Sequence, residues 1–191
     1  MRKTAIAACL SLLAGRSAVA ATAAGPPSQT LQACARAVNA GHSPGSRDQA
    51  LSRGVNITTL FDEAPVARDL ADIPRLRKIG VRHIRIPIDP VWVLSWPASG
   101  AADEKPRRLD TAVCAALSSG LAVILDNHDG SLQPKDTSGD DTLQRLGAAW
   151  DRLASRYAIF TPDLMFFEAL NDPAFTDAFH ASGRGMGQPQ P

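Results

Sequence analysis

The segment Leu-Met-Phe-Phe-Glu-Ala-Leu-Asn-Asp-Pro, residues 164–173, decides the fold. Its apolar run surrounds one glutamate, Glu168, and stops at Asn171-Asp172-Pro173. A short apolar run closed by polar residues and a proline is typical of a strand buried on both faces of a parallel sheet. Polar residues at the carboxyl end of such a strand carry the chemistry of α/β enzymes. The alternative is a strand followed by an ordinary turn, because asparagine, aspartate and proline all favour turns.

The chain before this segment alternates between strand and helix patterns. Short β-branched or apolar stretches predict strands at residues 54–60, 81–88 and 121–126. Apolar residues at three- and four-residue spacing predict helices at residues 66–80, 109–119 and 141–157. Gly80 and Gly120 are expected to end two of these helices, and Pro74 leaves open a later start for the first, with Asp72 as its cap. The order βαβαβαβ predicts parallel strands joined by right-handed crossovers.

Two architectures fit this order, a doubly wound open sheet and part of a (β/α)8 barrel. No Gly-rich phosphate loop follows the first strand, as dinucleotide-binding sheets require. Polar residues recur instead near the ends of several strands, at Arg85, at His128, and at Asn171 with Asp172. We therefore predict an α/β fold of the TIM-barrel type. Because a full barrel needs about 250 residues, we expect it to be truncated to about the first four βα units.

The N-terminal 50 residues are expected to lie outside this barrel. Residues 1–20 resemble a removable secretory signal, with a basic start, a short apolar run and the small-x-small pattern Ala18-Val19-Ala20. Residues 21–50 predict an extension or loop, with a short helix at 28–39 capped by Ser28. The compact domain is expected to begin near Leu51 and to end at residue 177, followed by an irregular or disordered tail at 178–191.

Composition narrows the classes of partner. Without residues 1–20 the chain has 17 basic and 19 acidic residues and no basic run, so a nucleic-acid partner is not expected. No later segment is apolar enough to cross a membrane, and no cysteine spacing suits a metal. Cys34 and Cys114 could pair in an oxidising compartment, but a buried free thiol is the expected state of Cys114.

Four segments, in order, are similar to motifs of glycoside hydrolase family 5, the large cellulase family. The four are Arg53-Gly54-Val55-Asn56; Leu-Arg-Lys-Ile-Gly-Val-Arg-His-Ile-Arg-Ile-Pro at 76–87; Gly-Leu-Ala-Val-Ile-Leu-Asp-Asn-His at 120–128; and Phe-Glu-Ala-Leu-Asn-Asp-Pro at 167–173. They resemble the first four barrel strands of that family, over about residues 51–177. The resemblance implies secreted hydrolysis of a polysaccharide or oligosaccharide by a retaining mechanism, with no cofactor.

The resemblance also implies roles for individual residues. Arg85 would orient a catalytic carboxylate, His128 would lie near the sugar before the cleaved bond, and Asn171 would donate to the sugar 2-hydroxyl. Asp172 stands at the acid/base position, where the family has glutamate. The alternatives are that Arg85 is an ordinary salt-bridged residue of a strand face and His128 a turn residue.

Two departures from the family pattern bear on activity. An aspartate withdraws the carboxyl group by roughly 1.5 Å, about one carbon–carbon bond, and misplacement on the order of 1 Å can cost about a hundredfold in rate. Glu168 is expected inside the barrel core and not as a substitute for Asp172. The family's nucleophile glutamate lies on strand seven, which has no counterpart in this sequence.

Other candidate sites are weaker. Trp92 and Trp96 follow the second strand and could form a sugar-stacking wall, or could equally be packing residues. Asp126-Asn127-His128-Asp129 has one histidine between two aspartates, which is a weak metal signal. The sequence thus predicts a hydrolase of β-glucan-type polysaccharides whose activity is impaired or absent. The second hypothesis is an inactive carbohydrate-binding or non-functional fragment; the sequence indicates neither the glycan nor the oligomeric state.

Overall fold

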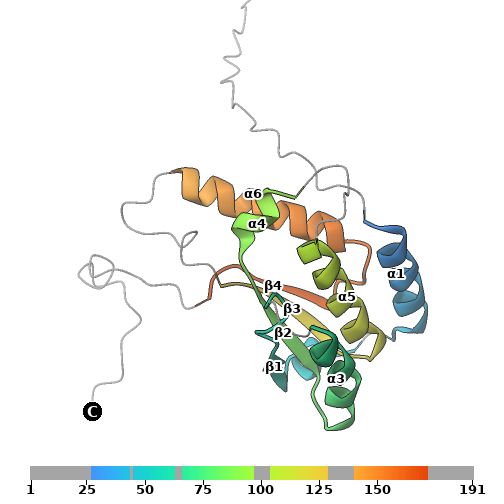
Figure 1. The fold of residues 1–191 in the computed structure, drawn as a ribbon. Helices are drawn as coiled ribbons and strands as arrows, with labels where there is room; N and C mark the ends of the chain where they lie inside the picture. The colour runs from blue at the N-terminus through green and yellow to red at the C-terminus, as the bar shows by residue number, and fades with distance from the viewer. Residues whose placement is uncertain (1–26, 44, 63–65, 97–103, 129–139, 172–191) are drawn as a thin grey trace, which may run out of the picture.

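A computed structural model describes residues 27–43, 45–62, 66–96, 104–128 and 140–171. Its centre is a sheet of four parallel strands in the order β1-β2-β3-β4 (Figure 1). The strands are β1 (Gly54–Asn56), β2 (His83–Ile88), β3 (Ala122–Asn127) and β4 (Met165–Glu168). A doubly wound sheet reverses its strand order at a switch point, and no reversal occurs among the described strands. The α/β class and the four parallel strands are confirmed, although β1 is shorter than predicted.

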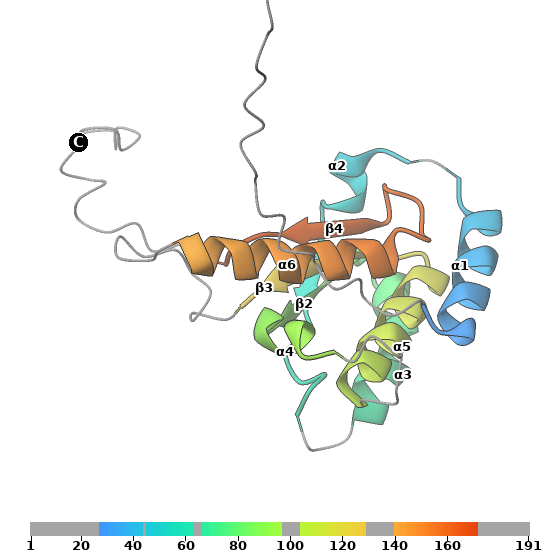
Figure 2. The same cartoon turned by 90° about the horizontal axis from the view of Figure 1, so that it is seen from above.

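The two faces of the sheet have different surroundings. The helices α3 (Val66–Lys78), α5 (Glu104–Ser118) and α6 (Asp140–Tyr157) lie on one side of it (Figures 1 and 2). Ile84, Ile86 and Ile88 of β2 point to this side and are buried, whereas Arg85 between them is half-buried. Each buried isoleucine contributes roughly 1.5–3 kcal/mol. We call the opposite face, on which Arg85 lies, the inner face.

Glycines end two of these helices, as the sequence predicted. Gly80 and Gly120 have φ of 93° and 76°, a left-handed conformation that favours glycine. Val81 N donates to Leu76 O at 3.1 Å, and Leu121 N donates to Ala116 O at 3.0 Å. These bonds across the glycine are those of the Schellman cap. They turn the chain from each helix directly into the next strand.

The predicted bounds of the longer helices agree with the structure to within two residues, except for the start of α5. α3 begins at Val66 and contains Pro74, so the later start capped by Asp72 is wrong. α5 begins at Glu104 and not at Leu109. Two short helices, α2 (Arg47–Ala50) and α4 (Pro90–Leu94), were not predicted. In α4 the proline after β2 opens a helical turn, since proline is well suited to the first helical position.

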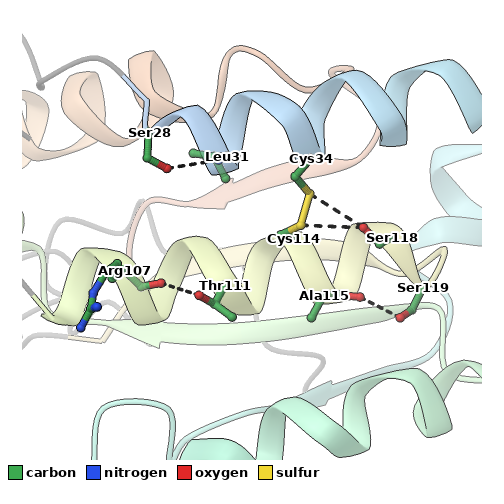
Figure 3. The surroundings of a disulfide bond; sticks show 9 residues. All are labelled: Ser28, Leu31, Cys34, Arg107, Thr111, Cys114, Ala115, Ser118 and Ser119. Carbon is green, nitrogen blue, oxygen red and sulfur yellow. Dashed lines mark hydrogen bonds between the residues drawn. A yellow bond between two sulfur atoms is a disulfide. The ribbon is translucent and has the colours of Figure 1, made fainter. Parts of the chain in front are cut away.

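The helix α1 (Gln29–Gly41) packs along α5 and is covalently attached to it (Figure 3). It begins after Ser28 as predicted, and Ser28 Oγ accepts a hydrogen bond from Leu31 N at 3.1 Å. Cys34 and Cys114 form a disulfide with a Cα–Cα distance of 6.1 Å. The prediction of a free thiol at Cys114 is therefore wrong, because contact between two helices 80 residues apart leaves no pattern in the sequence.

The packed core also begins earlier than Leu51, where we expected the compact domain to start. Leu31 and Ala35 of α1 are buried in the core. A second attachment joins the end of α1 to the segment before β4, since Asn39 Nδ2 donates to Ile159 O at 2.8 Å. The predicted signal at residues 1–20 and the predicted tail at 178–191 lie outside the described residues. Within the described ranges no helix is long and apolar enough to span a membrane.

A buried ion pair joins α5 to α6 within the helix layer. Arg156 of α6 donates to Asp110 of α5 through Nε at 2.8 Å and through Nη2 at 2.5 Å. Tyr157 OH donates to the same carboxylate at 3.1 Å. Burial raises the pKa of Tyr157, so its hydroxyl stays protonated and remains a donor. These bonds fix the two helices relative to each other.

Candidate active site

Backbone hydrogen bonds hold the carboxyl ends of three strands together. His128 N, just after β3, donates to Ile88 O at the end of β2 at 2.9 Å. Asn171 N, three residues after β4, donates to Asn127 O at the end of β3 at 3.0 Å. His128 and Asn171 therefore lie at the carboxyl ends of the strands, which is where barrel enzymes place their active sites.

Arg85 is the centre of a polar network on the inner face. Its Nε donates to Glu168 Oε2 at 2.7 Å, and its Nη2 donates to Glu168 Oε1 at 2.8 Å. The same Nη2 donates to Asn171 Oδ1 at 2.8 Å and lies 2.9 Å from Asp126 Oδ2. Three acceptors thus surround a nitrogen that carries two hydrogens, so at least one hydrogen is shared.

Asp126 connects this network to His128. Its carboxylate is fully buried, and Oδ2 lies 2.8 Å from His128 Nδ1 as well as near Arg85. Its Oδ1 is buried and has no hydrogen-bond partner among the described residues. Burial raises the pKa of Asp126, and the contacts with His128 and Arg85 oppose that rise. Asp126 thus holds Nδ1 of His128, whose imidazole is half-exposed at the carboxyl ends of the strands.

Glu168 has the opposite electrostatic environment. The hydrogen bonds from Arg85 lower the pKa of its carboxyl group, and burial opposes that effect only in part. Its side chain is 38% exposed, so it lies on the inner face and is open to solvent. A carboxylate held ionised by a bidentate arginine is a fixed negative charge and not a proton donor.

The network determines the orientation of Asn171. Because Oδ1 accepts from Arg85, the NH2 group of the amide faces away from the guanidinium. The acceptor side of the Asn171 amide therefore faces Arg85, and its donor side faces away. The sequence alone did not indicate this orientation. Asp172, the predicted acid/base residue, directly follows Asn171 but lies outside the described residues.

The structure brings together three predicted residues, Arg85, His128 and Asn171, and adds two that were missed. Asp126 and Glu168 were not predicted as members of the site. The signal for them was a charged residue within an otherwise apolar strand, which is rare unless the charge is paired. Their neighbouring positions follow from the register of the sheet, in which Asp126 pairs with Glu168.

The two predicted tryptophans differ in their surroundings. Trp96 is 6% exposed, and Arg156 Cζ lies 5.4 Å from the centroid of its ring. It thus belongs to the helix layer, so the packing interpretation accounts for Trp96, and a sugar-stacking wall that includes it is not supported. Trp92 is half-buried, with its ring 5.1 Å from that of Trp96 and 5.3 Å from that of Phe61. A contact between Trp92 and sugar stays a prediction.

The weak metal signal is not strengthened by the geometry. Asp126 and His128 are in contact, but they bond to each other. In the part of the chain that the structure describes, no group of three His, Cys, Asp or Glu side chains is placed to hold a metal ion.

Comparison with known proteins gives the same family as the motifs. The family model described as Cellulase (glycosyl hydrolase family 5) matches residues 51–181. Endoglucanase B of Paenibacillus lautus is 28% identical over 182 residues, which is 90% of this chain and 30% of the relative. Probable glucan 1,3-beta-glucosidase A of Aspergillus clavatus is 32% identical over 113 residues, 53% of this chain and 27% of the relative.

A further relative has the same name and similar coverage. The probable glucan 1,3-beta-glucosidase A of Aspergillus niger is 32% identical over 126 residues, 59% of this chain and 30% of the relative. The chain thus spans less than a third of the length of each of these three relatives. The family match, in contrast, covers well over half of the chain and includes all four strands and the whole Arg85 network. The chain belongs to glycosyl hydrolase family 5.

Proposed function

We propose that this chain acts on the O-glycosidic bonds of β-glucan-type polysaccharides, as a secreted, cellulase-like and retaining hydrolase. Membership of family 5 supports this proposal, as do relatives named endoglucanase and glucan 1,3-beta-glucosidase. The parallel sheet, with helices on one side and strands in sequential order, suits the first four βα units of a (β/α)8 barrel.

The observation that carries the proposal is the hydrogen bond between Arg85 and Asn171. It holds the asparagine that precedes Asp172 against a guanidinium fixed by two carboxylates. Pre-organised polar groups of this kind stabilise charge that develops during a reaction, since they need no reorientation. An ordinary turn after β4 would not need such support.

In the proposed mechanism each residue at the strand ends has its own task. Asp172 protonates the leaving oxygen, Asn171 donates to the sugar 2-hydroxyl, and His128 contacts the sugar before the cleaved bond. In a retaining reaction a carboxylate bonds to the anomeric carbon as the bond to the leaving oxygen breaks. These 191 residues hold no counterpart of the strand-seven glutamate that does this in the family, so we expect hydrolysis by these residues alone to be impaired or absent. Binding without hydrolysis is the alternative function.

Export of the protein is part of the proposal. A disulfide between Cys34 and Cys114 suits an oxidising compartment, because cytosolic thiols are kept reduced. We expect the mature protein to begin after Ala20. Mass spectrometry of the protein recovered from the culture medium or periplasm measures its N-terminus directly.

The test measures binding and hydrolysis separately. Electrophoresis in gels that contain mixed-linkage β-glucan or laminarin reports binding as retardation, and the release of reducing ends reports hydrolysis. Asp172→Asn removes the proton donor, and Asp172→Glu restores the longer carboxyl group of the family. We expect Asp172→Asn to abolish hydrolysis and to leave retardation unchanged. Asp172→Glu should raise the rate by on the order of tenfold to a hundredfold.

The possible outcomes separate the two functions. If the wild-type chain is retarded but neither wild type nor Asp172→Glu releases reducing ends, the function is carbohydrate binding alone. If neither polysaccharide retards the chain and no reducing ends appear, the proposal is wrong. Reducing ends that persist in Asp172→Asn would exclude Asp172 as the acid.

A further inference from the structure

A cavity of about 510 Å3 lies at the end of the sheet opposite to the candidate active site. Its lining includes Ala122, the first residue of β3, and Leu164, which directly precedes β4. Residues of α1, α2 and the end of α5 complete the wall. A volume of this size is typical of sites for small molecules. The proposed hydrolysis uses none of the residues that line it.

Two arginines line this cavity, and neither has a partner among the residues that the structure describes. Arg77, in the last turn of α3, and Arg82, directly before β2, both line it and are both half-buried. No described side chain or backbone carbonyl accepts a hydrogen bond from either guanidinium, and neither forms an ion pair with a described residue. Partial burial of a charge is unfavourable unless an opposite charge or hydrogen-bond acceptors compensate for it. The missing compensation can come from an anion in the cavity.

The side chain of Arg77 lies beside Gly120. A Cβ atom at Gly120 would lie 3.4 Å from Arg77 Nε, so the guanidinium passes directly over this residue. Gly120 also has the left-handed φ of 76° that ends α5. The same glycine therefore turns the chain into β3 and lines the cavity beside Arg77.

The acidic residue in the lining does not neutralise these arginines. Asp163 Oδ2 is bonded to His42 Nε2 at 2.7 Å, and both side chains are largely buried. The hydrogen bond from His42 lowers the pKa of Asp163, which keeps its carboxylate ionised and paired. Arg77 and Arg82 outnumber this single carboxylate, so the wall of the cavity carries an excess of positive charge.

We propose that this cavity binds a small anionic molecule, whose carboxylate or phosphate group is held by Arg77 and Arg82. Arginine is suited to both groups, because its planar guanidinium donates two parallel hydrogen bonds to their oxygens. The rest of the lining is mixed, with polar Gln49 and Ser118 beside apolar Val38 and Leu117. A hydroxylated acid of about the size of a sugar fits this volume and this mixture of groups.

The test uses three probes and the full chain. Isothermal titration calorimetry and thermal unfolding are measured with glucuronate, with glucose and with inorganic phosphate. Glucuronate has a carboxylate where glucose has a hydroxymethyl group, so their comparison isolates the charge, and phosphate separates the two anionic groups. The variants Arg77→Gln and Arg82→Gln each remove one charge, and Arg75→Gln is the control. Arg75 lies on the same helix, but it is exposed and paired with Asp72.

We expect glucuronate or phosphate to bind and to raise the unfolding temperature, and glucose to do neither. Arg77→Gln and Arg82→Gln should each weaken binding at least about tenfold, which is the usual scale for a hydrogen bond to a charged group. Arg75→Gln should bind as the wild type does, and added salt should weaken binding. Circular dichroism without ligand shows whether each variant is folded. Failure of both anions to bind, equal binding of glucose, or binding that survives both arginine changes would each overturn the proposal.

Discussion

Arg85 and Glu168 meet side by side on the inner face of the sheet, through two parallel hydrogen bonds of 2.7 and 2.8 Å. The arginine comes from β2 and the glutamate from β4, with β3 between them. Because β3 contributes Asp126 to the same guanidinium, one side chain connects three consecutive strands. The network is therefore both a structural clamp on the sheet and the support of the candidate active site.

Glu168→Gln should destabilise the protein in a pH-dependent manner. The pKa of Glu168 in the folded state lies below its ordinary value of 4.5, so its stabilising effect is complete above that value and is lost as the pH falls through the folded pKa. At pH 7 we expect a loss of about 1 kcal/mol, since the side chain is partly exposed. Urea unfolding at several pH values should show the difference from wild type shrinking below pH 4.5. Glu104→Gln, at an exposed ion pair, is the control.

The ionisation of Asp126 should affect the pH dependence of stability in the opposite direction. Burial raises its pKa above the ordinary value of 3.8, so the folded state retains the proton longer, and stability falls as the pH rises from 3.8 through the folded pKa. Asp126→Asn keeps an acceptor for Arg85 without a buried charge, and we expect its stability at pH 7 to be within about 1 kcal/mol of wild type. Asp126→Ala leaves Arg85 and His128 without that acceptor and should cost about 2 kcal/mol more. Equal losses in the two variants would contradict the role of Asp126 as an acceptor.

Reduction of the disulfide should loosen the attachment of α1. Replacing Cys34 and Cys114 by serine removes a cross-link between residues 80 apart in sequence and should cost about 2–5 kcal/mol. The measurement is the midpoint of urea unfolding with and without dithiothreitol. The wild-type midpoint should fall in the reductant, and the midpoint of the serine variant should not change. If dithiothreitol does not change the wild-type midpoint, the two cysteines are not oxidised in solution.

The buried pair of Asp110 and Arg156 should be the most sensitive contact of the helix layer. Asp110→Asn leaves Arg156 buried without a full counter-charge, and we expect a loss of about 3–5 kcal/mol. Asp72→Asn removes an exposed pair with Arg75 and should cost less than about 1 kcal/mol. Chemical unfolding of both variants compares them directly. Similar losses would mean that Arg156 finds water or another acceptor.

The sequence predicted the elements of this fold well where the signal was local. Apolar spacing indicated the helices, and Gly80 and Gly120 indicated their ends, because a left-handed cap depends on one residue and its neighbours. It predicted poorly what depends on contacts between distant segments. The Cys34–Cys114 bond requires α1 to lie along α5, and the apolar pattern within each helix does not specify its partner.

The candidate site follows the same division. Arg85 within β2, and His128 and Asn171 just after β3 and β4, were predicted from their motifs. Asp126 and Glu168 were visible in the sequence only as charged residues within apolar strands, and the register of β3 and β4 shows that the two carboxylates are neighbours. Register is a property of strand pairing, and a shift by one residue would turn both side chains to the helix side.

The contact between Gly54 and His83 provides a test of how tightly β1 pairs with β2. A Cβ atom at Gly54 would lie 1.9 Å from His83 Nε2, so the imidazole occupies the space of the missing side chain. His83 Nδ1 also lies 3.2 Å from Ala50 O, which limits how far the ring can move away. Gly54→Ala should therefore cost about 1–3 kcal/mol in the wild type and much less when His83 is alanine. Urea unfolding of the two single variants and the double variant measures this coupling, and we expect it to exceed about 1 kcal/mol. Additive losses would mean that β1 shifts to accept the methyl group. The pairing of β1 with β2 would then be looser than the 2.9 Å hydrogen bond from Ile57 N to Arg85 O indicates.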